Sequence, residues 1–241
     1  MLPCTPYSCQ VTSSQFSDEP ERTRLTRAAV VDRALALADA AGLEALTIRK
    51  LATELGVTPM ALYWHFRGKD ELLEGLADRL WSEIDLTLDR SAPWKGQLRA
   101  VFTSLLTVLR THPAAPALLA RSNIVKSEAG LNALEVALEL LRTAGFSPAD
   151  ASAVARSTLW TALTLVMSEP GIEMLDNAER EEFQRKKAVT MATLSPARYP
   201  RVVECAIPMT ACDDPEEHYQ FGIDVFIEGV AAIAAKRAGG S

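Results

Sequence analysis

Apolar residues recur with the spacing of an α-helix along almost the whole chain. The first such run predicts a helix from about residue 25 to Gly42, because a glycine commonly ends a helix. Its apolar face consists of Val30, Ala34, Leu37, Ala38 and Ala41. No segment alternates apolar and polar residues as a half-buried strand does. The pattern therefore predicts an all-α fold.

Two short helices follow the first one closely. Thr47 is a suitable N-cap for the second helix, which ends at Gly56. Thr58 can cap a third helix, and Pro59 then occupies the first helical position, where its missing N–H costs nothing. Two short helices separated by a tight glycine turn are typical of a helix-turn-helix.

A longer helix is predicted to begin near Lys69 and to end before Pro93. We place a three-helix head at residues 22–70 and a larger helical body at residues 71–241, where it would provide ligand binding and dimerisation. Residues 1–21 lack a period and are expected to form a disordered tail. Helices are predicted in the body at 94–111, 115–122, 128–144, 148–168, 178–194 and 216–237. Residues 195–215, which contain four prolines, are expected to form a long loop.

The helices predicted at 148–168 and 216–237 are apolar over unusually wide arcs. Such a helix must bury more than one side, so one side can face the chain's own core and another a second copy. The residues expected at this dimer interface are Val154, Thr158, Phe226, Ile227 and Val230. The alternative is that both helices are central in a monomer.

Charge is unevenly distributed along the 241 residues. The whole chain carries a net charge of −6, yet residues 22–69 hold eight basic and four acidic residues, a balance of +4. The rest therefore carries −10. A basic head on an acidic body favours contact between the head and a polyanion, although a chance fluctuation gives the same count. No apolar run approaches the roughly 18–20 residues that cross a bilayer, and the N-terminus lacks signal-peptide features. We expect no membrane association and a cytoplasmic location.

The cysteines do not form a known metal or redox motif. Cys4 and Cys9 have four residues between them, and Cys205 and Cys212 have six. Neither spacing matches a zinc knuckle or a CxxC pair, so free thiols are expected. No HExxH, GxSxG or P-loop motif is present. We expect no enzyme activity, no metal and no cofactor. The alternative is a helical metal enzyme that uses Cys205, Cys212, Asp213, Glu217 and His218.

Two stretches carry a specific resemblance. LTIRKLATELGV (residues 46–57) and LYWHFRGKDELL (residues 62–73) resemble the DNA-binding head of the TetR family of bacterial repressors. The resemblance covers roughly residues 25–85, and the body is similar only in general architecture. It implies an all-helical homodimer that binds operator DNA through its heads and holds a small-molecule inducer in its body. It also implies that the ligand moves the long helix beginning near Lys69 and thereby releases DNA.

The predicted third helix supplies most of the expected DNA contacts. Arg49 can form a bidentate pair with guanine, whereas Tyr63, His65 and Lys69 suit phosphates. Trp64 either contacts DNA or braces the turn. The full set of predicted DNA-binding residues is Arg27, Thr47, Arg49, Thr58, Pro59, Met60, Ala61, Tyr63, Trp64, His65 and Lys69. A different hypothesis is a helical scaffold whose head binds protein.

The body is expected to bind a mostly apolar effector. The residues predicted to line its pocket are Phe102, Leu105, Leu106, Trp160, Thr164 and Met167. Ordinary core packing explains the same residues. In the tetracycline-responsive members of the family that this chain resembles, a histidine of the body helps to hold the drug as a magnesium chelate. Here the body has only His112, at a helix end before a proline, and His218. We therefore expect a ligand other than a tetracycline–magnesium chelate.

Overall fold

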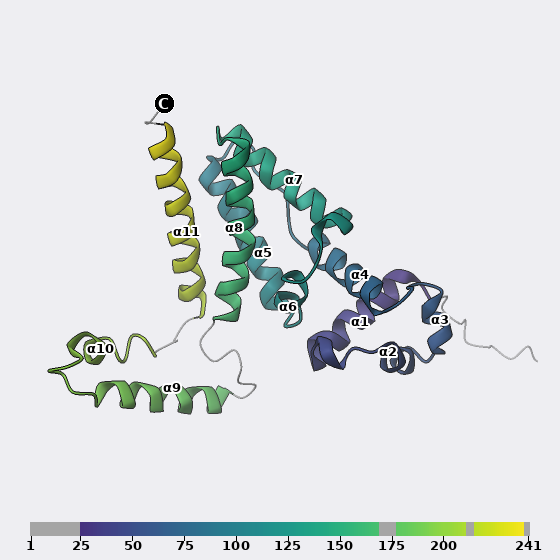
Figure 1. Ribbon diagram of the computed structural model, residues 1–241, viewed down its shortest axis with the longest axis horizontal. Coiled ribbons are helices and arrows are strands. Elements are labelled where there is room, and N and C mark those ends of the chain that lie inside the picture. Colours follow the sequence, from purple (N-terminus) through teal and green to yellow (C-terminus); the bar gives the residue numbers. More distant parts are fainter. Residues whose placement is uncertain (1–24, 169–176, 211–214, 239–241) are drawn as a thin grey trace, which may run out of the picture.

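The computed structural model describes residues 25–168, 177–210 and 215–238, and every element in these ranges is helical (Figure 1). The predicted all-α fold is confirmed. The expected tail at residues 1–21 lies outside the described residues, as do Cys4, Cys9, Cys212 and Asp213. None of the helices within the described ranges is long and apolar enough to span a lipid bilayer.

The first four helical elements form the compact head at one end of the molecule. They are α1 (Arg27–Ala41), the 3₁₀ turn η1 (Leu43–Ala45), α2 (Ile48–Glu54) and α3 (Pro59–Tyr63). The turns between them use left-handed backbone at Gly42 (φ 79°) and Gly56 (φ 65°), which glycine adopts without a side-chain clash. The head core is formed by Val30, Ala34, Leu35, Leu46, Leu51, Leu62 and Phe66, all buried.

Helix α4 (Lys69–Ser82) joins the head to the body. It packs against α1 on the head side and against α6 and α7 on the body side. Its buried residues are Leu72, Leu76, Ala77, Leu80 and Trp81. A displacement of α4 must therefore disturb contacts in both parts, since both are closely packed on the same helix.

The body is a bundle built around α5 (Trp94–Thr111), which packs against α7 (Glu128–Thr143), α8 (Pro148–Met167) and α11 (Pro215–Ala238). Helix α11 approaches α8 closely at Gly222. A Cβ atom there would lie within 2.4 Å of the Leu165 side chain. Two short elements, α6 (Ala115–Leu119) and η2 (Ile124–Lys126), connect α5 to α7.

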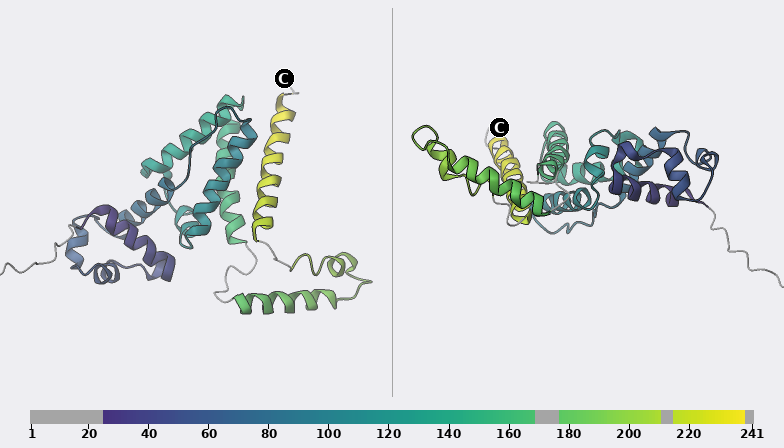
Figure 2. Two further views of the ribbon diagram at one scale, coloured as in Figure 1. Left: turned by 180° about the vertical axis from the view of Figure 1, so that it is seen from behind. Right: turned by 90° about the horizontal axis from the view of Figure 1, so that it is seen from below.

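Helices α9 (Asn177–Ala192) and α10 (Pro200–Glu204) pack on each other and project away from the bundle in both figures (Figures 1 and 2). The prediction of a long loop at residues 195–215 is wrong for Pro200–Glu204, which form α10. Pro200 occupies the first position of that helix, where proline is favoured, so it starts a helix instead of preventing one.

Candidate DNA interface and ligand cavity

Side-chain caps fix the starts of both helices in the helix-turn-helix. The hydroxyl oxygen of Thr47 accepts a hydrogen bond from the Lys50 N–H at 3.1 Å. The hydroxyl of Thr58 accepts from the Ala61 N–H at 3.4 Å. The Thr47 cap satisfies one of the first amides of α2, which have no i−4 partner within the helix, and the Ala61 N–H of α3 also bonds to the Thr58 carbonyl at 3.0 Å. The short helix α3 thus has a defined start and presents one face outward.

Helix α3 lies at the end of the molecule opposite α11 (Figure 1). Large apolar and aromatic side chains of α3 and its C-cap are exposed there. Met60 is 68% exposed and Trp64 is 87% exposed, while Tyr63 is about half exposed. On the inner face of the same segment, Leu62 and Phe66 are buried in the head core. A fixed helix that keeps its own core intact and still presents these side chains to solvent is suited to contact a partner.

Several cations near α3 are available for a polyanion. Arg49, Lys50 and Arg67 are exposed and form no ion pair with any residue in the described ranges. Arg49 lies in the first turn of α2, the helix that packs on α3. Thr47, Thr58 and Pro59 are also exposed, whereas Ala61 and His65 are partly buried. All of these residues belong to the helix-turn-helix or to the segment directly after it.

Arg27 and Lys69 differ from the other predicted DNA contacts because their charged groups already have partners. The Arg27 guanidinium donates to the His65 carbonyl at 2.9 Å and to the Glu71 carboxylate at 3.0 Å, and it stacks 4.4 Å from the Phe66 ring centre. The Lys69 ammonium donates to the Leu43 carbonyl at 3.3 Å. Both side chains brace the segment after α3 against the rest of the head.

Glu71 completes this brace. Its carboxylate accepts the Arg67 backbone N–H at 2.8 Å as well as the Arg27 bond. The Arg67 amide first, and the Arg27 guanidinium second, hold the pKa of Glu71 below its ordinary value. Glu71 therefore stays charged at neutral pH, and it neutralises Arg27 in place.

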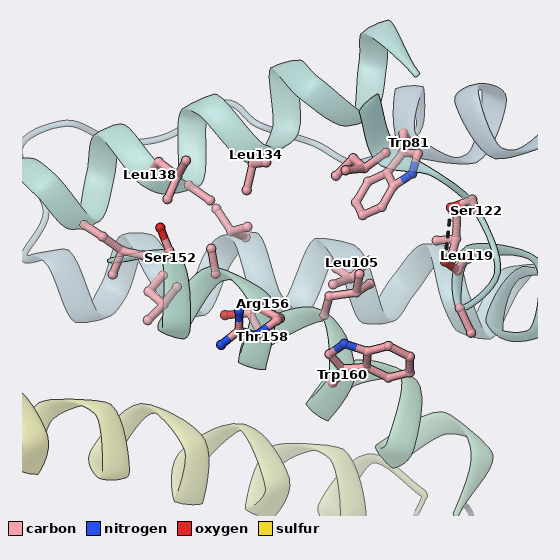
Figure 3. Close-up of a pocket in the computed structure, with 18 of the residues that line it drawn as sticks. Trp81, Leu105, Leu119, Ser122, Leu134, Leu138, Ser152, Arg156, Thr158 and Trp160 are labelled. Atoms are coloured by element: carbon pink, nitrogen blue, oxygen red, sulfur yellow. Dashed lines mark hydrogen bonds between the residues drawn. The ribbon is translucent and has the colours of Figure 1, made fainter. Parts of the chain in front are cut away.

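The body contains an apolar cavity of about 560 Å³ between α4, α5, α7 and α8 (Figure 3). Trp81 comes from α4, Leu105 from α5, Leu134 and Leu138 from α7, and Trp160 from α8. This volume falls within the range of small-molecule sites, and such sites are mostly apolar with a few polar groups. The cavity therefore has the size and chemistry of a ligand site.

A few polar groups lie among the apolar walls. They are Ser122, Asn123, Ser152, Arg156 and Thr158. The Thr158 hydroxyl is already used, since it donates to the Val154 carbonyl at 2.9 Å. The indole N–H of Trp81 is buried and finds no acceptor among the described residues. Arg156 is exposed, so it stands at the rim and not in the interior.

Two of the six predicted pocket residues, Leu105 and Trp160, line this cavity. The other four do not. Phe102 and Leu106 are buried on another side of α5, where the Phe102 ring lies 5.1 Å from that of Phe226. Thr164 and Met167 are exposed further along α8. The helical spacing of apolar residues identified apolar positions on α5 and α8, but it did not indicate which side of each helix faces the cavity.

Sequence reasoning missed the contribution of α4 and α7 to the cavity. Helix α7 supplies Leu134, Ala137, Leu138 and Leu141, which follow the i, i+3, i+4, i+7 spacing of one helix face. Such a face is also expected for core packing, so the spacing alone gives no signal of a cavity. The lone tryptophan on α4, Trp81, is the sequence feature that could have indicated it.

The predicted dimer surface needs a correction in its residues. Val154, Thr158, Ile227 and Val230 are buried within the chain itself, and only Phe226 is partly exposed. Buried side chains have little area left for a partner. The exposed apolar side chains on the same two helices are Trp160, Met167, Phe221, Val225 and Ile233. Dimerisation through α8 and α11 remains a prediction.

No group of three or more His, Cys, Asp or Glu side chains that could hold a metal ion occurs in the part of the chain that the structure describes. His112 and His218 do not line the cavity. The His218 ring Nε2 lies 3.1 Å from the Leu165 carbonyl. No histidine from the described part of the body is therefore placed to hold a ligand-bound metal in the cavity.

Two sequence profiles match the chain. The profile described as bacterial regulatory proteins, tetR family, matches residues 30–76, and the tetracyclin repressor-like, C-terminal domain matches residues 88–234. Similar curated proteins include the HTH-type transcriptional repressor DrrR1 of Streptomyces coeruleorubidus, 28% identical over 90% of this chain and 81% of its own length. The tetracycline repressor protein class C of Escherichia coli is 29% identical over 86% of this chain and 91% of its own.

Solved structures share the fold. The Streptomyces coelicolor TetR family protein ActR in complex with actinorhodin superposes with a TM-score of 0.78 at 24% identity, covering 87% of this chain and 97% of that one. A TetR variant from Acinetobacter baumannii in complex with minocycline gives a TM-score of 0.62 at 23% identity, covering 87% and 98%. At these identities the likeness concerns the fold.

Proposed function

The chain belongs to the TetR family of DNA-binding transcriptional regulators, and from this premise we propose how it acts. It binds operator DNA as a homodimer, with α3 of each head in a major groove. A small ligand in the body cavity then weakens this binding, so that the protein is a ligand-released repressor. Such a regulator works in the cytoplasm and has no catalytic site.

The observation that supports DNA binding most strongly is the exposed face of α3. Met60 and Tyr63 face solvent from this capped helix, and so does Trp64 at its C-cap position. The exposed Arg49 of α2 forms no ion pair within the described ranges. Apolar side chains can contact thymine methyl groups, and an Arg fork fits the O6 and N7 atoms of guanine. Thr47, Thr58, Pro59, Ala61 and His65 surround this centre and are assigned to phosphate or base-edge contacts.

Arg27 and Lys69 take a different part in this proposal. Their existing bonds to the His65 and Leu43 carbonyls hold the segment after α3 in place. They position the reading helix, and any contact they make with phosphate is secondary. A protein partner is the alternative occupant of this surface, as in the scaffold hypothesis. Arg49, Lys50 and Arg67, which form no ion pair within the described ranges, favour a polyanion instead.

The effector is proposed to be a mostly apolar small molecule. The 560 Å³ cavity has walls of Leu, Val, Ala and Trp side chains. The similar protein ActR forms a complex with actinorhodin, and other relatives are tetracycline repressors. Because no described body histidine reaches the cavity, we propose a ligand that binds without a histidine-held metal.

Selection from a random pool of duplexes tests this function. The purified protein is expected to enrich a two-fold symmetric sequence at low salt, with half-sites about one helical turn apart. The control is Met60→Asp combined with Tyr63→Ala, which removes the exposed α3 face without touching the buried Leu62. Failure of the wild-type protein to enrich any duplex would contradict the proposal.

A further inference from the structure

His112 lies where the head meets the body. It is the C-terminal cap residue of α5, directly before the short helix α6. Its ring Nδ1 is 2.7 Å from an Asp39 carboxylate oxygen, and its Nε2 is 2.9 Å from a Glu83 carboxylate oxygen. Asp39 belongs to the last turn of α1 in the head, and Glu83 is the C-cap of α4. One side chain thus joins three helices.

The two contacts define the protonation of the ring. A carboxylate oxygen only accepts hydrogen bonds, so each ring nitrogen must carry a hydrogen to make both bonds. With both carboxylates ionised, His112 makes both hydrogen bonds only as an imidazolium. The C-terminal ends of α1, α4 and α5 meet here, and a helix C-terminus carries partial negative charge. A cation at this point stabilises all three ends.

The bonds extend on both sides of His112. The second Asp39 oxygen accepts the Ala114 N–H at 3.0 Å, which fixes the chain just before α6. The second Glu83 oxygen lies 2.6 Å from the Arg79 guanidinium, and Arg79 donates to Asp32 of α1 at 2.9 Å. We call Asp32, Asp39, Arg79, Glu83 and His112 together the head–body clasp.

We propose that His112 is a positioning residue of the regulatory switch, which holds the DNA-binding head at a fixed angle on the body through its paired contacts to Asp39 and Glu83. The proposal rests on the proposed function. It goes further, because it assigns the connection between cavity and head to one side chain.

The clasp is continuous with the cavity. Helix α6 begins three residues after His112, and its end contributes Leu119 and Ala120 to the cavity wall. On α4, Trp81 lines the cavity and lies two residues before Glu83. A ligand that shifts either wall therefore displaces one side of the clasp relative to α1. The ligand acts only as far as its affinity differs between the two arrangements.

The charge state gives this proposal a specific pH dependence. Burial alone lowers the pKa of His112, but the hydrogen bonds to Asp39 and Glu83, together with their charges, outweigh burial and raise it above its usual value of about 6.5. The clasp is complete below about pH 6.5 and is lost as the pH rises through the raised pKa. One ring nitrogen then gives its proton to solvent, and one of the two carboxylates loses its hydrogen bond from His112.

The test measures how strongly the protein prefers the half-site spacing that it selects over a spacing that is one base pair longer. The wild-type protein first selects its duplex, and one base pair is then inserted between the half-sites. Discrimination is the ratio of the two dissociation constants. His112→Gln and Asp39→Asn are each expected to reduce this ratio by at least about fivefold, because the head can then adopt other angles. The matched control is His218→Gln, which removes a body histidine remote from the head.

A titration from pH 6 to pH 9 separates a positioning role from a structural one. Wild-type discrimination is expected to fall at alkaline pH, with a midpoint above about 6.5, while His112→Gln gives a flat profile. The ratio compares the same protein on two duplexes, so any effect of pH that is common to both duplexes cancels. The wild-type titration needs no variant and therefore remains decisive if a substitution prevents folding.

Three results are informative. Loss of discrimination in both clasp variants, with a pH-dependent wild type, supports the inference. A folded His112→Gln protein with wild-type discrimination, or a flat wild-type profile, overturns the inference alone. A wild-type protein that selects no duplex overturns the proposed function and the inference with it.

Discussion

Trp64 is 87% exposed, the highest value among the large apolar side chains that the structure describes. The sequence indicated that the TPMALYWHF segment binds something, because aromatic and basic residues are concentrated there. It did not indicate which side chains face outward. Leu62 and Phe66, four positions apart, are buried in the head, and this leaves Tyr63 and Trp64 on the opposite side. Once the start of the helix is known, helical geometry decides which of these side chains are buried and which are exposed.

Arg49→Ala is expected to relax base preference at one position in each half-site, by about 1–3 kcal/mol. Its guanidinium is exposed and forms no ion pair within the described ranges, so the substitution leaves the head intact. Lys69→Ala should instead weaken binding to all sequences by a similar factor, since it loosens the Leu43 contact. Binding measured on a panel of single-base operator variants distinguishes the loss of base preference in Arg49→Ala from the uniform loss of affinity in Lys69→Ala. Unchanged base preference in Arg49→Ala would contradict its role.

At the scale of elements, one buried hydroxyl contributes to the link between α4 and the start of α7. Ser127 caps α7 by accepting the Gly130 N–H at 2.8 Å. It also donates to the Asp78 carboxylate of α4 at 2.8 Å, and that carboxylate accepts the Ala129 N–H at 3.0 Å. The start of α7 is therefore held on the helix that joins head and body.

Ser127→Ala is expected to lower the free energy of unfolding by about 1–3 kcal/mol, because it removes a cap and leaves a partly buried carboxylate short of a donor. Urea denaturation measures this change from the midpoint. Ser168→Ala, an exposed serine at the end of α8, serves as the control and should change it by under about 0.5 kcal/mol. Equal midpoints for the two variants would refute this role for Ser127.

The sequence predicted most helices because capping residues and apolar period are local signals. Thr26, Thr47, Thr58, Ser127 and Ser147 all accept a hydrogen bond from their own helix. Contacts between distant residues have no such signal. Asp39 and His112 are 73 positions apart, so the sequence indicated only a helix-end role for His112. The cavity wall on α7 was missed for a similar reason, since a core face and a cavity face have the same spacing.

At the scale of the whole molecule, α8 and α11 leave large apolar side chains exposed. Phe221 is 72% exposed, and Val225 and Ile233 are more than half exposed. A shallow groove of about 440 Å³ runs between the two helices and includes Val225, Phe226 and Ile233. An exposed apolar patch of this kind marks an interaction site, and a second copy would bring two heads to one operator.

Val225→Asp is expected to convert the dimer to a monomer and to weaken operator binding by at least about 100-fold, since one head alone makes half the contacts. Light scattering coupled to size exclusion measures the mass. The matched control is Val125→Asp, which changes an exposed valine of η2 at 70% exposure and should leave mass and binding unchanged. A Val225→Asp protein that remains dimeric at micromolar concentration would exclude this surface as the interface.

The salt dependence of operator binding tests the central claim most directly. The affinity of the wild-type protein for its selected duplex is measured from 50 to 200 mM salt. If the two heads neutralise about six to ten phosphates, affinity should fall by about 10³–10⁵-fold over this range. An affinity that does not change with salt, or no binding to any duplex at low salt, would contradict a DNA-binding role for the exposed face of α3.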